Sequence, residues 1–203
     1  MIRETFISTL LQRQHAPNDR AVFLREFLRH PYQVASIIPS SRFLERRVVE
    51  LAGITSARTV VELGAGTGGT TRAILRELPL NGKLLVIEIN PHFCATLRRI
   101  PDSRLIVHQG SAHELPQAIA MAGLPAPDAI VSGIPFSTMS CSAGARILEG
   151  VTSALGNGGR FVAYQFRNQV DVLARPLLGA ARIELALFNI PPMRIYRWQK
   201  QAG

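Results

Sequence analysis

Short apolar runs alternate with amphipathic segments along most of the chain, and glycine or proline separates many of them. Runs rich in valine, isoleucine and leucine are typical of strands buried in a parallel sheet, whereas apolar positions that recur every three to four residues are typical of helices. The strands predicted in this way are Thr59–Leu63, Lys83–Ile89, Arg104–His108, Asp128–Ser132, Arg160–Phe166, Arg182–Phe188 and Met193–Gln199. The helices predicted from residue 42 onward are Arg42–Ala52, Thr70–Leu78, Pro91–Arg99, Glu114–Met121, Cys141–Leu155 and Val170–Leu178.

The order of these elements predicts an α/β fold with a mostly parallel, Rossmann-like sheet of seven strands, because strands and helices alternate over short connections. The last two strands are joined only by Asn189–Pro192, which suits a hairpin, so the last strand should run in the reverse direction. We expect residues 53–203 to form this domain and residues 1–52 to form a helical segment before it.

The first thirty residues predict two amphipathic helices, one on either side of His15–Asp19. The apolar residues that share one face of the first helix are Ile2, Phe6, Ile7, Leu10 and Leu11. An amphipathic helix flanked by arginines either lies in a membrane interface or covers the core of its own domain, and both roles stay open. This segment lacks the uninterrupted apolar core of a secretory signal, and prolines interrupt the apolar stretch Leu115–Phe136. We therefore expect a cytoplasmic protein that is peripheral to the cytoplasmic membrane.

The chain carries an excess of positive charge. The chain of 203 residues has a formal net charge of +9, and Lys83 and Lys200 are its only lysines, so arginine carries nearly all of the charge. An anionic partner, either a membrane surface or a nucleic acid, would explain this charge, and so would an arginine-rich genome. Cys94 and Cys141 predict neither a disulfide framework nor a metal site, which fits a reducing compartment.

Candidate chemistry begins at Thr59–Ala73, where an apolar strand runs through a glycine-rich turn into a helix. Glycines at alternate positions let the backbone turn sharply and approach a ligand that a Cβ would obstruct. The residues of this turn that are expected to contact a cofactor are Gly64, Gly66, Thr67 and Gly68. With Gly69 the turn also fits the dinucleotide pattern G-x-G-x-x-G, so the glycines alone leave two cofactor classes open.

Two acids near this turn favour one of the two classes. Glu62 lies two residues before Gly64, where a carboxylate can pair with a cationic amino-acid moiety. Glu88 ends the next strand, where a carboxylate suits a ribose diol, and Ile89 follows it. The combination resembles the first two motifs of class I methyltransferases that use S-adenosylmethionine. We expect this cofactor, with a nicotinamide cofactor as the main alternative.

Further contacts to the cofactor are expected from two other segments. Ser111 and Ala112 follow the third strand, where class I enzymes commonly place an acidic or polar side chain against the adenine amine. No acid stands there, so the Ser111 hydroxyl or the Ala112 backbone would replace it. Ser40 or Ser41 is expected to cap the helix that begins at Arg42. The segment Tyr32–Arg47 is expected to close over the methionine end of the cofactor, with Ser41 as a contact.

The fourth strand leads into the sequence SGIPF, at the position where amine methyltransferases hold the nucleophile. The candidate acceptor residues in this loop are Ser132, Gly133, Ile134, Pro135 and Phe136. Backbone carbonyls of the loop are expected to orient a nitrogen, and the face of the Phe136 ring to favour a cationic product. The alternative is a turn with a buried phenylalanine. Tyr32 is a further candidate on the acceptor side, and Tyr32, Tyr164 and His113 are the candidate general bases.

A more specific resemblance covers roughly Phe27–Trp198. The chain resembles the bacterial phospholipid N-methyltransferases in the segments FLRHPYQVASIIPSSRFLERR, VVELGAGTGGTTRAIL, VIEIN, DAIVSGIPF, RFVAYQF and NIPPMRIYRW. The resemblance implies an enzyme that methylates phosphatidylethanolamine towards phosphatidylcholine. It also implies a peripheral membrane enzyme whose N-terminal amphipathic helix binds anionic lipid. The expected partners are therefore an anionic membrane surface and a phospholipid substrate, without a metal, and a monomer is the default.

Three other functions stay open, and one of them is methylation of another small-molecule amine. RNA adenine N6-methyltransferases have a similar glycine loop and an acceptor motif N-[IL]-P-[YF], but Gly133 stands here in place of the asparagine that would accept from the base amine. The absence of an acid at Ser111 also leaves room for a paralogue without catalytic activity.

Overall fold

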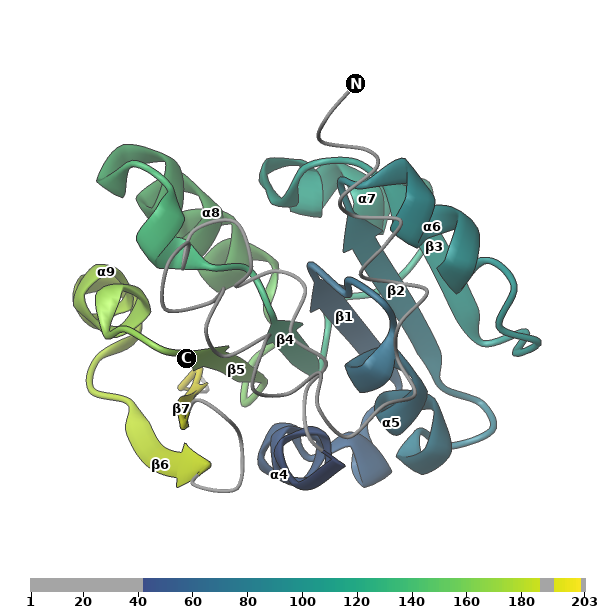
Figure 1. Ribbon diagram of the computed structural model, residues 1–203, viewed down its shortest axis with the longest axis horizontal. Helices are drawn as coiled ribbons and strands as arrows, with labels where there is room; N and C mark the ends of the chain where they lie inside the picture. Colours follow the sequence, from purple (N-terminus) through teal and green to yellow (C-terminus); the bar gives the residue numbers. More distant parts are fainter. Residues whose placement is uncertain (1–41, 187–191, 202–203) are drawn as a thin grey trace, which may run out of the picture. The chain divides into compact units, whose positions relative to one another are not determined.

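The computed structural model describes residues 42–186 and 192–201, and in this part of the chain seven strands form one sheet (Figure 1). The strands are β1 (Thr59–Leu63), β2 (Lys83–Glu88), β3 (Leu105–Gln109), β4 (Ala129–Ser132), β5 (Arg160–Gln165), β6 (Arg182–Ala186) and β7 (Met193–Gln199). Their order is β3-β2-β1-β4-β5-β7-β6; β7 is antiparallel to β5 and β6, and the other pairs are parallel. The predicted α/β fold with a reversed last strand is therefore confirmed.

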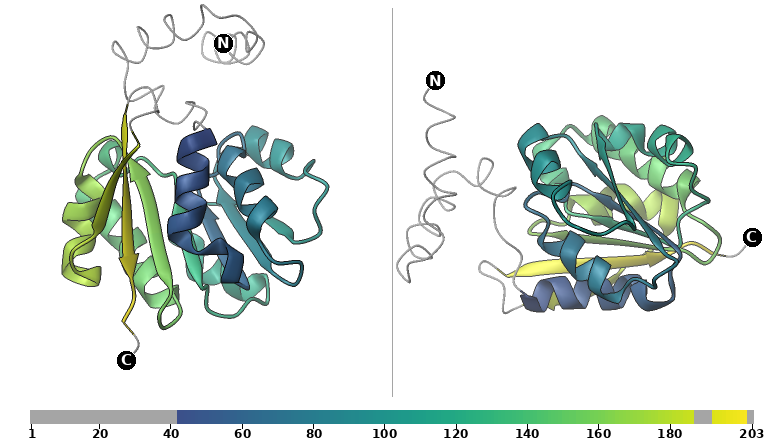
Figure 2. Two further views of the ribbon diagram at one scale, coloured as in Figure 1. Left: turned by 90° about the horizontal axis from the view of Figure 1, so that it is seen from below. Right: turned by 90° about the vertical axis from the view of Figure 1, so that its right-hand side faces the viewer.

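Helices cover both faces of the sheet (Figures 1 and 2). The α-helices are α4 (Arg42–Ala52), α5 (Gly69–Glu77), α6 (Pro91–Leu97), α7 (Leu115–Met121), α8 (Cys141–Ala154) and α9 (Gln169–Leu178). Helices α4, α5 and α6 pack on one face, where Leu44, Ile74 and Leu97 are part of a buried core. Helices α7, α8 and α9 pack on the other face, around a core that includes Phe161 and Trp198. The short 3₁₀ helices are η1 (Ile54–Ser56), η2 (Ala112–Glu114) and η3 (Phe136–Thr138).

Most elements agree with the sequence prediction to within one or two residues. The second strand ends at Glu88, because Asn90 caps α6 by accepting a hydrogen bond from the His92 N–H at 2.9 Å, which places Ile89 in the turn. The hairpin connection Asn189–Pro192 stays a prediction, since residues 187–191 lie outside the described residues.

Helix α4 shares the core of the sheet, although the sequence analysis placed it in the segment 1–52. Its apolar face buries Leu44 and Val48 completely, against β5 and β7. Arg47 forms two hydrogen bonds with Glu184 of β6, from Nε to Oε2 at 2.6 Å and from Nη2 to Oε1 at 3.0 Å. This bidentate ion pair joins the first described helix to the edge of the sheet.

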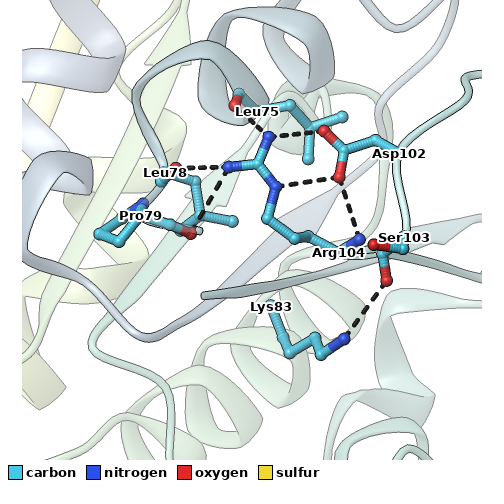
Figure 3. Close-up of polar contacts among 7 residues, drawn as sticks. All are labelled: Leu75, Leu78, Pro79, Lys83, Asp102, Ser103 and Arg104. Atoms are coloured by element: carbon cyan, nitrogen blue, oxygen red, sulfur yellow. Dashed lines mark hydrogen bonds and ion pairs between the residues drawn. The ribbon is translucent and has the colours of Figure 1, made fainter. Parts of the chain in front are cut away.

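The turn before β3 carries an ion pair that caps helix α5 (Figure 3). Arg104 donates from Nη2 to the carbonyl of Leu75, in the last turn of α5, at 2.7 Å, and from Nη1 to the carbonyl of Leu78, the C-cap of that helix. The same guanidinium donates from Nε to Asp102 Oδ1 at 2.9 Å. Its hydrogen bonds lower the pKa of Asp102 to about 2 from an ordinary value of 3.8. One side chain thus satisfies carbonyls that a helix end leaves unpaired.

We expect Arg104→Met to lower the free energy of unfolding by about 1 to 3 kcal/mol, because partly buried carbonyls and a carboxylate lose their donor. Arg104→Lys keeps the charge without the planar fork, so it should recover only part of this loss. The folded-state pKa of Asp102 is depressed, so its contribution is complete above pH 3.8 and is lost as the pH falls towards 2. Urea unfolding of the three proteins between pH 2 and 7 measures both effects; equal stability at pH 7 would contradict the assignment.

Candidate functional site

The glycine turn after β1 contains three residues in the left-handed region. The φ angles of Gly64, Gly66 and Gly68 are 73°, 54° and 82°, which side chains with a Cβ rarely adopt. The Gly64 N–H donates to the Ile87 carbonyl at 2.9 Å, so the ladder between β1 and β2 continues into the turn. Between two of these glycines lies Thr67, which is partly exposed. The turn therefore presents its backbone at the ends of β1 and β2.

Glu88 lies directly against this turn. Its side chain is 5% exposed, and its two oxygens accept from the backbone N–H groups of Gly66 and Asn90, both at 2.9 Å. Each carboxylate oxygen can accept a second hydrogen bond, so both remain able to receive a hydroxyl group. The next residue, Ile89, is 71% exposed and offers an apolar surface beside the acid. This arrangement suits a ribose with an adjoining flat base.

Glu62 carries a buried carboxylate with one unsatisfied oxygen. The Thr71 hydroxyl donates to Oε2 at 2.6 Å, and among the described residues no donor bonds to Oε1. Complete burial raises the pKa of Glu62 to about 7 from 4.5, although the bond from Thr71 acts in the opposite direction. A buried acid oxygen without a donor is costly unless a ligand supplies one. A cationic amino group fits this requirement, which agrees with the role expected for Glu62.

The adenine side of the expected site contains an acid that the sequence analysis missed. Ser111 accepts from the His113 N–H at 3.4 Å and donates its own N–H to Glu114 Oε1 at 2.8 Å, which is a capping box at the start of η2. Glu114 Oε2 also contacts His108 Nε2 at 3.1 Å. The hydrogen bond from the Ser111 backbone, followed by the contact with His108, lowers the pKa of Glu114. The Glu114 carboxylate thus fixes the turn that contains Ser111 and Ala112. The sequence pattern S-x-x-E, which is typical of a capping box, could have predicted this contact.

The acceptor loop is held by Gln165 at the end of β5. The Gln165 side chain is 5% exposed; its Nε2 donates to the Ile134 carbonyl at 2.6 Å and its Oε1 accepts from the Phe136 N–H at 3.3 Å. Ser132 is buried, and its hydroxyl accepts from the Ile134 N–H at 3.3 Å. The Gly133 N–H donates to the Leu63 carbonyl at 2.9 Å, which continues the ladder between β1 and β4. The loop therefore has a fixed backbone, and one of its carbonyls is already engaged.

Phe136 does not present its ring to an acceptor in this structure. The side chain is fully buried and belongs to the core that α8 and α9 cover. A Cβ placed at Gly144 of α8 would lie 3.4 Å from the Phe136 ring, so helix and ring are in close contact. The position is that of a core residue, which was the alternative left open by the sequence. Ile134 and Pro135 are the partly exposed side chains of the loop.

The structure brings the candidate residues of four segments to one edge of the sheet, at the ends of the parallel strands β1, β2, β3 and β4. Tyr32 and Ser41 lie outside the described residues, so their expected roles remain predictions. His113 contributes its backbone N–H to the cap at Ser111, and its side chain is exposed. Within residues 42–186 and 192–201, no group of three histidine, cysteine or acidic side chains is placed to hold a metal ion.

Proteins of similar sequence include an ornithine lipid N-methyltransferase of Singulisphaera acidiphila, which is 32% identical over 145 residues, 70% of this chain and 76% of that protein. The ribosomal RNA small subunit methyltransferase A of Maricaulis maris is 35% identical over 97 residues, which are 46% of this chain and 32% of that protein. No family model matches the chain.

Solved structures of methyltransferases share the fold. The O-methyltransferase TomG of Streptomyces achromogenes, in complex with S-adenosylmethionine, has a TM-score of 0.64 at 16% sequence identity, covering 81% of this chain and 82% of TomG. The precorrin-6y C5,15-methyltransferase of Geobacter metallireducens has a TM-score of 0.63 at 15% sequence identity, covering 81% of this chain and 91% of that protein. These likenesses show the fold, and the Singulisphaera protein shows the family.

Proposed function

Because this chain belongs to the class I S-adenosylmethionine-dependent methyltransferases, in the family of the Singulisphaera lipid enzyme, we propose that it methylates the amine of a membrane lipid. The substrate proposed first is phosphatidylethanolamine, with its methylated forms, on the way to phosphatidylcholine. The observation that carries the proposal is the similarity to a lipid N-methyltransferase over most of both chains. The ribosomal RNA relative is matched over only a third of its length.

The described residues fit the cofactor. Glu88 would accept from the ribose hydroxyls, Ile89 would cover the adenine, and the unsatisfied oxygen of Glu62 would accept from the cationic amino group. When bound, S-adenosylmethionine supplies an activated methyl group, whose carbon bonds to the acceptor nitrogen while the carbon–sulfur bond breaks and its electron pair stays on sulfur. The protein must therefore align and desolvate the nitrogen more than it must activate it.

A fixed acceptor loop serves this alignment. Gln165 holds two backbone groups of the loop, and the ladder bond of Gly133 holds a third. A loop with a fixed backbone can hold the acceptor nitrogen in line with the methyl group, so less conformational entropy is lost when the transition state forms. An ammonium has no lone pair, so the acceptor must lose a proton before transfer. The free energy of this deprotonation is part of the barrier to methylation.

A second acceptor has support of its own. The Singulisphaera enzyme is named for ornithine lipid, which also carries a primary amine. Ornithine lipid is therefore the second substrate that we propose. An RNA base fits less well. A Cβ at Gly133 would lie 2.5 Å from Tyr164 Oη and 2.7 Å from the Gly64 carbonyl oxygen, so an asparagine at this position has no room.

Contact with the membrane is proposed to be peripheral. Of the helices that the structure describes, none is long and apolar enough to cross a bilayer. The formal net charge of +9 favours an anionic surface, and each arginine near such a surface adds about 1 kcal/mol to binding. The amphipathic helices predicted before residue 30 are the proposed membrane contact, and they lie outside the described residues.

The test uses the purified full chain, labelled S-adenosylmethionine and vesicles of anionic phosphatidylglycerol that contain phosphatidylethanolamine, ornithine lipid or neither. We expect label in phosphatidylethanolamine, and label in ornithine lipid alone would identify the second substrate. Deletion of Met1–Arg13 removes all five apolar residues of the face predicted for the first helix, so vesicle binding and lipid methylation should fall about tenfold or more while cofactor binding persists. Full activity of the shortened chain would contradict the membrane role of the helix, and label in ribosomal RNA but in no lipid would reject the lipid assignment.

A further inference from the structure

A row of three side chains runs from the acceptor loop towards the last strand of the sheet. Gln165 of β5 lies opposite Arg194 of β7, and Arg194 lies opposite Leu185 of β6. Side chains of directly paired residues stand on the same face of a sheet, here the face on which α8 and α9 pack. Because Gln165 holds the acceptor loop, Arg194 and Leu185 are the next two side chains outward from that loop.

The guanidinium of Arg194 turns towards the site. Its Nη1 donates to the carbonyl of Phe166, the residue after Gln165, at 3.1 Å. The charged group therefore lies at the end of β5, and β5 pairs with β4, the strand that leads into the acceptor loop. Neighbouring strands of a sheet are about 4.8 Å apart. Arg194 thus places a cation about one strand spacing from the loop that is proposed to hold the acceptor nitrogen.

The charge of Arg194 is not neutralised by a carboxylate of the described residues. The side chain is exposed, and the ion pairs formed within residues 42–186 and 192–201 do not include it. Asp171, in the first turn of α9, accepts instead from Nη2 of Arg175 at 2.9 Å. A guanidinium carries five N–H donors in one plane, a geometry that matches the oxygens of a phosphate.

Beyond Arg194 the row continues into an apolar surface. Leu185 is 60% exposed, and Ile183, on the same face of β6, is 48% exposed. In the order of the described strands β6 is the last, so these side chains stand at the edge of the sheet. An apolar surface next to a cation matches the order of groups in a phospholipid, in which the apolar chains follow the phosphate.

We propose that Arg194 binds the headgroup phosphate of the phospholipid substrate, and that Leu185 and Ile183 contact the apolar part of the lipid. The inference deepens the proposed function and rests on it. Two carbons join the nitrogen of the ethanolamine headgroup to the ester oxygen of its phosphate, a length that fits one strand spacing of about 4.8 Å. With the amine at the acceptor loop, the phosphate lies at Arg194 and the chains extend towards β6. Arg194 takes no part in methyl transfer, so its effect is on substrate affinity.

The first measurement is the rate of methylation by the full chain in micelles of a nonionic detergent that contain phosphatidylethanolamine. In these micelles the substrate is the only phosphate, and the surface has no net charge to attract the protein. Arg194→Gln removes the charge but keeps a donor for the Phe166 carbonyl, and Arg194→Lys keeps the charge. Arg182→Gln is the matched control, because Arg182 is an exposed arginine of β6 that lies 3.4 Å from Glu184, on the opposite face of the sheet.

The second measurement reads binding without turnover. Calorimetry of each protein, saturated with S-adenosylhomocysteine, gives the Kd for hexyl phosphate, which carries a phosphate and an apolar tail but no amine. Inorganic phosphate is the probe without a tail. Hexyl phosphate should bind to the wild type at least about tenfold more tightly than inorganic phosphate, because its tail contacts Leu185 and Ile183.

We expect Arg194→Gln to raise both the KM for phosphatidylethanolamine and the Kd for hexyl phosphate about tenfold to a hundredfold, the effect of one hydrogen bond between charged groups. The kcat and the Kd for S-adenosylmethionine should change less than about threefold, because these steps do not involve the phosphate. Arg194→Lys should recover part of the affinity, since a lysine keeps the charge without the planar fork. Arg182→Gln should match the wild type throughout.

A purely structural role of Arg194 would lower kcat and thermal stability and leave KM unchanged, and that result would overturn the inference. An equal loss in Arg182→Gln, a wild type that does not bind hexyl phosphate, or equal affinity for inorganic phosphate would overturn it as well. In each of these cases methylation of phosphatidylethanolamine by the wild type still supports the proposed function. A wild type that labels no phospholipid, in micelles or in vesicles, would overturn the proposed function and this inference together.

Discussion

Gly66→Val should raise the Kd for S-adenosylmethionine by about a hundredfold or more, the equivalent of about 3 kcal/mol. Two causes act together. The φ of 54° at Gly66 is strained for a β-branched residue, so the turn must rearrange, and the added side chain fills the space in which the backbone would meet the cofactor. Rearrangement also breaks the bond of 2.9 Å from the Gly66 N–H to Glu88, the acid expected to hold the ribose.

The variant Gly123→Val is the control that separates backbone strain from the loss of cofactor binding. Gly123 also has a positive φ, of 63°, and a Cβ there would meet no atom within 4 Å. Both variants should lose stability to a similar extent, and only Gly66→Val should lose the cofactor. Calorimetric titration of the three proteins gives the Kd, and thermal unfolding gives the stability. A Kd within threefold of the wild type for Gly66→Val would show that the turn does not contact the cofactor.

Glu62→Gln should stabilise the cofactor-free protein at pH 8 and weaken cofactor binding at the same pH. The folded-state pKa of Glu62 is raised by burial, from 4.5 to about 7. The folded state therefore binds more protons than the unfolded state between these values, so stability falls as the pH rises through this window. Above pH 7 the buried charge costs about 3 kcal/mol, which the glutamine variant avoids. Below pH 4.5 the two proteins should be equally stable.

The cofactor reverses the sign of this effect. A cationic amino group at Oε1 favours the ionised carboxylate, so the affinity of the wild type should rise with pH up to about 7, with a proton released on binding below that value. In Glu62→Gln this pH dependence should disappear and the Kd should be about tenfold to a hundredfold higher at pH 8. Calorimetry in buffers of different ionisation enthalpy counts the protons. Equal proton release from both proteins would assign the titration to another group.

The parts of the site that could be predicted from the sequence are those formed by residues close together in the chain. Glu62, Gly64 and Gly66 lie within five residues, and Glu88 ends the next strand, so a local pattern identifies them. Gln165 acts on a loop about thirty residues away, and nothing near it in the sequence indicates this contact. The proximity of Tyr164 to Gly133 likewise arises only when β5 pairs with β4.

Phe136 shows a different limit of prediction. Its neighbours indicate a ligand-side loop, but the direction of the side chain depends on how α8 packs. Gly144 lets that helix approach the ring, and the ring becomes part of the core. The fold was predicted more completely than the site, since the alternation of buried strands and amphipathic helices is repeated along the chain.

The core beneath α4 has a consequence for synthesis of the protein. It combines Leu44 and Val48 near the start of the described chain with Met193 and Ile195 of β7, and Arg47 pairs with Glu184 across 137 residues. The ribosome delivers α4 long before β7, so the apolar face of this helix lacks part of its native cover until nearly the whole domain has emerged. Contacts so distant in sequence also form slowly. A nascent chain halted before β7 should therefore be a substrate for chaperones, and this half of the domain should fold only after synthesis is nearly complete.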